Sequence, residues 1–182
     1  DGRRQLDNLL KNGMHFYDFI RANVLNGVSA ALVRRDVIME LGGFDAGLRY
    51  CEDRFMWTRI AEHWEIHTVP QVLLERTVNS GNMTANPKKH YQNKIRFIEV
   101  YLDRYAAQLS KQQQIEFVLA NHTDFLNTFS RGGEHVEVID VYQRMFKHSW
   151  QTLFFDHGKP TLRYLYACAK TWRKPTASTT AH

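Results

Sequence analysis

The feature that most constrains the fold is a helical rhythm of apolar residues from residue 87 onward. The first such stripe is formed by Tyr91, Ile95, Ile98, Leu102 and Tyr105. Their spacings of four, three, four and three place them on one face of an amphipathic helix. Ser110 and Gln113 have the spacing of a capping box, which predicts the start of a second helix. Further stripes predict helices around 138–145 and over about 160–172, so this half of the chain is expected to be helical.

The part before residue 86 has a different pattern. "GVSAALVRR" (27–35) is small and apolar and predicts a buried strand near residues 30–33. A short helix is expected next, ended by Gly42 and Gly43, because glycine is preferred just past a helix end. Residues 65–77 are rich in strand-forming residues, and Pro70 predicts two short strands there. Short strands mixed with helices predict an α/β region.

Composition and charge limit the class of protein. No run of about 18 or more apolar residues is present, so no transmembrane helix is expected, and the first residues lack the apolar core of a signal peptide. Cys51 and Cys168 fit no disulfide framework, which favours reduced thiols and a cytoplasmic location. The net charge of +5 reflects a basic C-terminal end without acidic residues after Asp156. Basic residues are not interleaved with aromatics along a domain face, so no nucleic-acid partner is predicted.

An acidic pair, Glu52–Asp53, precedes the apolar run "RFMWTRIA". Asp53 could cap the helix that follows by accepting backbone N–H bonds. For such a pair taken alone this is the more frequent role, and the alternative is a catalytic carboxylate that takes a proton from a substrate hydroxyl. Spacing alone does not choose between the two.

The flanks of the pair carry an ordered set of motifs. These are the small-residue segment with Arg34-Arg35-Asp36, the turn Gly42-Gly43-Phe44-Asp45, and a strand and polar loop with Arg76 and residues 79–84. The helix between them matches the pattern acid-acid, hydrophobic, Trp, Arg, hydrophobic, Ala through Glu52, Asp53, Met56, Trp57, Arg59, Ile60 and Ala61. Over roughly residues 23–100 the chain resembles the second half of the inverting family 2 glycosyltransferases.

The resemblance implies a fold and an activity. The fold class would be α/β: residues 1–106 would be the acceptor-side half of a GT-A domain, with a mixed sheet flanked by helices. Residues 107–174 would be an all-α extension, and 175–182 a disordered tail. The family transfers a sugar from a nucleotide-sugar to an acceptor hydroxyl with inversion, here to a glycan or lipid-linked acceptor in polysaccharide or envelope glycan synthesis.

The resemblance also assigns roles to residues. Asp53 would be the general base. Substrate contacts are expected at Glu52, at Gly42 and Gly43, and at Trp57 and Arg76. For these the alternatives stay open, because backbone geometry explains the glycines, a helical Trp is more often core, and an Arg is often a surface ion-pair partner.

Two departures from the family bear on activity. No His follows Arg76, where many members have one. No Asp-x-Asp motif and no glycine-rich phosphate loop occurs in the 182 residues. The divalent cation, Mg or Mn, expected for the full-length enzyme would therefore have its ligands elsewhere. With no initiator Met, the sequence is expected to be an inactive fragment. The alternative is a non-catalytic remnant whose helical part binds a partner.

Two further patterns were weighed. His63 and His67 are four residues apart, but the expected helix ends between them, so no metal site is predicted. The segment 160–174 has an apolar stripe, comprising Leu162, Leu165, Tyr166, Ala169 and Trp172, and a basic side. Such a helix fits peripheral contact with the inner face of a membrane. Packing of the stripe on the preceding helices is the alternative, and it is the one that we expect.

Overall fold

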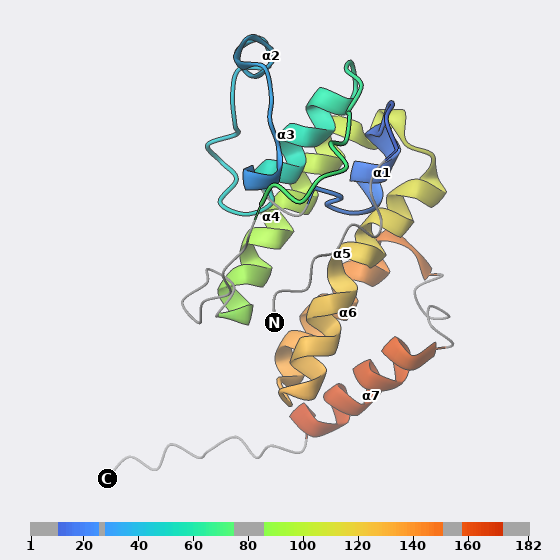
Figure 1. Ribbon diagram of the computed structural model, residues 1–182. Coiled ribbons are helices and arrows are strands. Elements are labelled where there is room, and N and C mark those ends of the chain that lie inside the picture. The colour runs from blue at the N-terminus through green and yellow to red at the C-terminus, as the bar shows by residue number, and fades with distance from the viewer. Residues whose placement is uncertain (1–10, 26–27, 75–85, 151–157, 173–182) are drawn as a thin grey trace. The chain divides into compact units, whose positions relative to one another are not determined.

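The computed structural model describes residues 11–25, 28–74, 86–150 and 158–172. The chain divides into two compact units, Asp1–Gln108 and Leu109–His182. The first contains α1 (Phe16–Arg21), the 3-10 turn η1 (Val28–Ala30), α2 (Arg35–Glu40), α3 (Glu52–Ala61), α4 (Pro87–Tyr105) and η3 (Ala106–Gln108). The second contains α5 (Lys111–Arg131), α6 (His135–His148) and α7 (Lys159–Trp172) (Figure 1).

The predicted mixed sheet is wrong for the part of the chain that the structure describes, where the fold is all-helical and no β-strand occurs. The expected strand near 30–33 begins as η1 and continues without regular structure. Of the expected strands over 65–77, residues 65–74 contribute one isolated antiparallel bridge, between Gly13 and Ile66. Residues 75–77 lie outside the described ranges.

The reason for this error is visible in the side chains of these segments. Ala31 and Val33 pack on the core while Leu32 between them is fully exposed, which is the alternation of a strand. Trp64 and Ile66 likewise point inward on either side of an exposed Glu65. A sheet, however, requires a ladder of backbone hydrogen bonds between strands. The sequence contains the side-chain pattern of a strand. The ladder also requires a neighbouring strand, and none pairs with these segments in the part of the chain that the structure describes.

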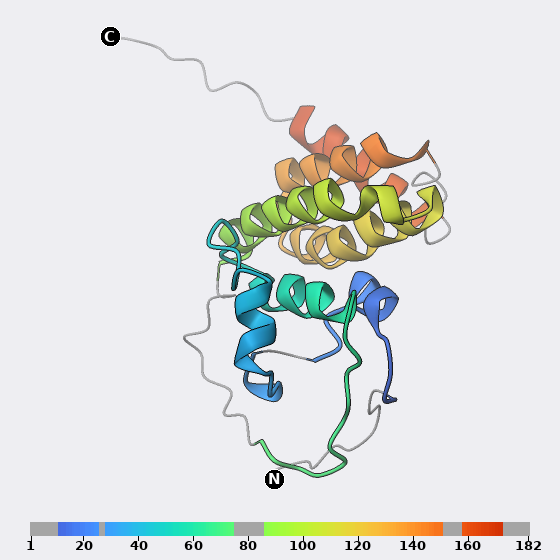
Figure 2. The ribbon, with the colours of Figure 1, turned by 90° about the horizontal axis from the view of Figure 1, so that it is seen from above.

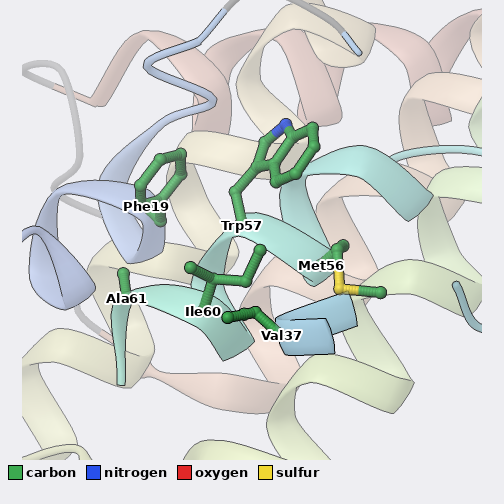
Figure 3. Close-up of a cluster of buried hydrophobic side chains, with 6 residues drawn as sticks. All are labelled: Phe19, Val37, Met56, Trp57, Ile60 and Ala61. Carbon is green, nitrogen blue, oxygen red and sulfur yellow. The ribbon is translucent and has the colours of Figure 1, made fainter. Parts of the chain in front are cut away.

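The core of the first unit forms around α3. Its buried cluster comprises Phe19, Val37, Met56, Trp57, Ile60 and Ala61 (Figure 3). These side chains come from α1, α2 and α3, so α3 supplies most of the cluster and the two shorter helices cover it. On another side of α3, the ring of Phe55 lies 6.0 Å from that of Tyr101 in α4, and Thr58 Oγ1 lies 2.8 Å from the Tyr101 hydroxyl.

The second unit follows the periodicity of its sequence. α6 packs against both α5 and α7 (Figure 2). The capping box is confirmed: Gln113 N donates to Ser110 Oγ at 3.2 Å, and Ser110 N donates to Gln113 Oε1 at 2.8 Å. Buried core residues from its three helices include Val118, Leu126, Phe129, Val138, Val141, Met145 and Ala167.

The prediction that the apolar stripe of 160–172 packs on the preceding helices is wrong. α7 packs through its other side, where Pro160 and Ala167 are buried. Leu162, Leu165, Tyr166 and Trp172 are exposed. The expected disordered tail, 175–182, falls outside the described ranges.

Candidate functional site

The acidic pair forms the first two residues of α3. The helix N-cap is Cys51, in a left-handed conformation with φ 58° and without a side-chain cap bond. Asp53 is therefore not the N-cap. One of its carboxylate oxygens accepts the backbone N–H of Arg54 at 2.7 Å, and the other accepts from Asn23 Nδ2 at 3.1 Å. The helix dipole also stabilises a carboxylate in the first turn. Asp53 is thus a half-buried carboxylate whose orientation is fixed by a hydrogen bond to each of its oxygens.

Arg54 anchors this end of α3 and is almost fully buried. Its Nε donates to the Phe19 carbonyl at 2.7 Å and its Nη2 to the Ile20 carbonyl at 2.5 Å. Its guanidinium carbon lies 5.3 Å from the centroid of the Phe97 ring. Burial lowers the pKa of Arg54. The two bonds satisfy carbonyls near the end of α1, which no later helical N–H reaches, and so fix α3 against α1.

Sequence reasoning missed Arg54, although a signal was present. In the helix that follows the pair, Arg54 is spaced by four from Thr58 and by seven from Ala61, and both are fully buried. An arginine on the buried face of a helix requires internal acceptors. The sequence could have shown that Arg54 was anchored, but not which carbonyls it would meet.

The Gly-Gly turn is attached to α3 by a second arginine. Gly42 and Gly43 have φ of 77° and 78°, the left-handed region that glycine adopts without strain. Arg59 Nη1 donates to the Gly43 carbonyl at 2.9 Å, and Nη2 donates to the Leu41 carbonyl. The turn therefore lies against the helix that begins with the acidic pair.

A cavity of about 430 Å³ opens beside this turn. Its lining includes Gly42 and Gly43, Asp45, Arg59 and Asp103. The lining combines charged side chains, which can hydrogen-bond to hydroxyls, with the apolar residues Leu41, Phe44, Phe55 and Val100. Asp53 is not part of this lining.

Trp57 lies in the core, with 3% of its surface exposed. The edge of the Phe44 ring meets it at a centroid distance of 6.1 Å. Its Nε1 has no hydrogen-bond partner in the described structure, and the residue lines a second cavity of about 260 Å³ together with Val37, Ile60 and Trp64. The ring is therefore a core element and presents no open face as a sugar platform.

A set of side chains from α4 and its surroundings lies beside the start of α3. Lys94 Nζ is 3.5 Å from Cys51 Sγ and 5.5 Å from the Tyr50 ring centroid, and the rings of Tyr50 and His90 are 3.9 Å apart. Burial raises the pKa of Cys51, and burial followed by the charge of Lys94 lowers the pKa of His90. The thiol and the imidazole are thus held neutral, which leaves Lys94 as the charge of this set. These residues were not predicted, because Lys94 lies 43 residues after Cys51 in the sequence.

The remaining predicted positions lie as follows in the structure. Glu52 is half-buried at the first position of α3. Arg76 falls in the undescribed range 75–85. His63 lies beyond the end of α3, and His67 Nε2 lies 3.3 Å from Glu65 Oε2. Within the described ranges, no group of three or more His, Cys, Asp or Glu side chains is placed to hold a metal ion.

Comparisons of the chain with protein-family models, with curated proteins and with solved structures give no match. Among the helices that the structure describes, none is both long and apolar enough to cross a membrane.

Proposed function

We propose that this chain supplies the acceptor side of an inverting glycosyltransferase of family 2, with Asp53 as the general base. The observation that carries this proposal is the setting of Asp53. Its carboxylate is half-buried, bonded on one side by Asn23 and on the other by the Arg54 N–H. A carboxylate held in this way can accept a proton in a fixed direction.

The arrangement of the resembling motifs gives further support. The Gly-Gly-Phe-Asp turn and the acidic pair are separated in sequence, yet Arg59 of α3 bonds to the carbonyls of Leu41 and Gly43 in that turn. Glu52, Gly42, Gly43 and Arg76 remain proposed acceptor or donor contacts, while Trp57 would act by supporting α3 from the core.

The proposed reaction is a single displacement. Asp53 takes the proton of the acceptor hydroxyl while that oxygen bonds to the anomeric carbon of the sugar. The bond from this carbon to the nucleoside diphosphate breaks on the opposite face, so the configuration inverts. A divalent cation, Mg or Mn, would neutralise the departing diphosphate. Its Asp-x-Asp ligands do not occur in this chain, so residues outside it would hold the ion.

Nucleotide-sugars are made in the cytoplasm, which is the location we propose, and the acceptor would be a glycan or a lipid-linked glycan. The test uses the open reading frame that encodes this chain. The measurement is release of nucleoside diphosphate from a panel of nucleotide-sugars with saccharide acceptors. We expect Asp53→Asn to lower kcat by a factor of about 10² to 10⁴, the usual contribution of a general base.

The matched control is Asp18→Asn, an exposed carboxylate in the first turn of α1. It should retain the parental kcat. Full activity of Asp53→Asn would refute the assignment of the base. Absence of transfer from every donor in the parental protein would favour the alternative, a non-catalytic binding module.

A further inference from the structure

α7 carries an exposed face of apolar side chains that the core of the second unit does not use. The exposed fractions are 66% for Leu162, 56% for Leu165, 57% for Tyr166 and 91% for Trp172. At about 100° per residue, these four and Ala169 fall within an arc of about 120°. A continuous stripe of this kind, rather than scattered apolar residues, marks an interaction surface.

The opposite side of α7 is already occupied. The rings of Tyr164 and Tyr142 stack at 4.5 Å, and the Tyr142 hydroxyl lies 2.8 Å from Thr161 Oγ1. Pro160 and Ala167 are buried on this side. The rotation of α7 is therefore set by its contact with α6, and the apolar stripe is held outward.

The charged residues of α7 itself have one sign. Lys159 and Lys170 are exposed and lie along one edge of it, and Lys170 Nζ is 5.4 Å from the centroid of the Tyr166 ring. Arg163 is half-buried and bonds to Asn127 of α5. α7 contains no acidic residue. Any occupant of this face therefore meets an apolar strip with lysines of α7 along one edge.

We propose that α7 lies flat on an anionic lipid surface, with its apolar stripe at the boundary of headgroups and acyl chains. Leu162 and Leu165 would supply the apolar area, and Tyr166 and Trp172 are residue types enriched at membrane–water interfaces. Lysines along the edge would bind anionic headgroups while their stems remain on the apolar surface. The contact is peripheral and amphipathic.

The charge pattern favours lipid over a protein occupant. Lysine is depleted in protein interfaces relative to the rest of the protein surface. A second copy of this chain would bring Lys159 and Lys170 against identical cations, which opposes self-association. The surface is carried by α7 alone and does not depend on sugar transfer, although an acceptor anchored in lipid would be met at the same surface.

The test is flotation of the full chain with vesicles of phosphatidylcholine containing phosphatidylglycerol, and with vesicles of phosphatidylcholine alone. We expect binding to the anionic vesicles, weakened severalfold or more by high salt because the cations are screened. The double variant L162A/L165A should weaken binding by about tenfold or more, since each substitution removes apolar area from the contact. Leu73→Ala is the matched control, because Leu73 is 72% exposed and lies outside α7. It should bind as the parental chain does.

Several results would overturn the proposal. One is failure to bind anionic vesicles in low salt. A second is binding that L162A/L165A leaves unchanged, which would place the contact elsewhere. A third is a dimer that L162A/L165A dissociates, measured by light scattering without lipid, because a second copy would then occupy the stripe. Tryptophan fluorescence distinguishes insertion of the stripe from simple charge attraction. In the parental chain the emission should shift to shorter wavelength when vesicles bind, because Trp172 enters the lipid. The variant Trp172→Phe should lose that shift.

Discussion

The two units of this chain are stabilised by different kinds of polar contact. In the first, buried side chains of α3 reach residues far away in sequence: Arg54 bonds to the Phe19 and Ile20 carbonyls, and Thr58 pairs with Tyr101. In the second, the polar side chains of α5 mainly bond to carbonyls four residues earlier in their own helix. Examples are Asn121 to Phe117, Thr123 to Leu119 and Thr128 to Asp124. The first unit therefore adds long-range polar anchors of the buried helix α3 to its apolar core. In the second unit the bonds within α5 are mainly local, and Asn127, which accepts from Arg163 of α7, is the exception among those named here.

The largest expected effect tests the apolar side of this comparison. Phe129 of α5 is fully buried, so Phe129→Ala should lower the free energy of unfolding of the second unit by about 3–5 kcal/mol. Hydrogen exchange of α5 amides measures the loss. Phe146→Ala is the control, because that ring is 44% exposed, and it should have a much smaller effect. Equal effects would show that burial does not control this unit.

The next effect tests the polar side. Arg54→Met removes two hydrogen bonds from a charged donor and leaves two carbonyls without a partner, so we expect a loss of about 3 kcal/mol in the first unit. Exchange of the α1 and α3 amides should report it. Arg54→Lys should recover part of the loss, because it keeps the charge but lacks the fork of donors.

The control for Arg54 is Arg96→Met, since Arg96 is an exposed residue of α4. If Arg54→Met were no more destabilising than Arg96→Met, the long-range anchor would have no energetic weight. Loss of α5 protection in Arg54→Met would also contradict the distinction between the units.

Alkaline pH should lower the stability of the first unit through two of its buried tyrosines. Burial is the main cause of the raised pKa values of Tyr101 and Tyr105. In the unfolded chain these phenols ionise near pH 10. Above that pH these two phenols keep more protons in the folded than in the unfolded state, so their contribution to stability should be constant below about pH 10 and fall as pH rises further. Absorbance of tyrosinate measures the ionisation of the phenols, and unfolding by denaturant at several pH values measures the stability.

Tyr101→Phe isolates one of these contributions. At neutral pH it should cost about 1 kcal/mol through loss of the bond to Thr58. Its stability should then fall less steeply than that of the parental chain above pH 10. An unchanged slope would show that Tyr101 titrates normally in the folded protein.

The smallest effects compare the starts of two long helices. Ser110 caps α5 and Asn86 caps α4, each through one side-chain acceptor. Ser110→Ala and Asn86→Ala should each lower stability by about 1 kcal/mol, one in each unit. Amide exchange in the first turns of α5 and α4 separates the two. A global loss of protection from either change would contradict the local character of these caps.

The same contrast explains what the sequence could predict. The helices at 87–172 and the capping box at Ser110 were predictable because a helix needs only its own hydrogen bonds and one apolar face. A strand near residues 30–33 was also predicted, but a sheet requires a second strand, and a small apolar segment does not supply it. The orientation of α7 was predicted incorrectly because its small buried residues, Pro160 and Ala167, gave a weaker signal than the stripe of Leu and Trp.

At the candidate site, the sequence placed Asp53 at the start of a helix and Gly42–Gly43 in a turn. It could not place Asn23 beside Asp53, or Lys94 beside Cys51, because these contacts span 30 and 43 residues. Arg59 appeared only as one member of a motif. Its bonds to the turn carbonyls became evident from the packing of α3 against that turn.

The most direct test compares the two members of the acidic pair. In the open reading frame that encodes this chain, kcat for sugar transfer should be measured for Glu52→Gln and Asp53→Asn side by side. If Asp53 is the base, Asp53→Asn lowers kcat by about 100-fold or more, and Glu52→Gln by less than about tenfold. Transfer by Asp53→Asn at the parental rate, or a larger loss in Glu52→Gln, would contradict the assignment.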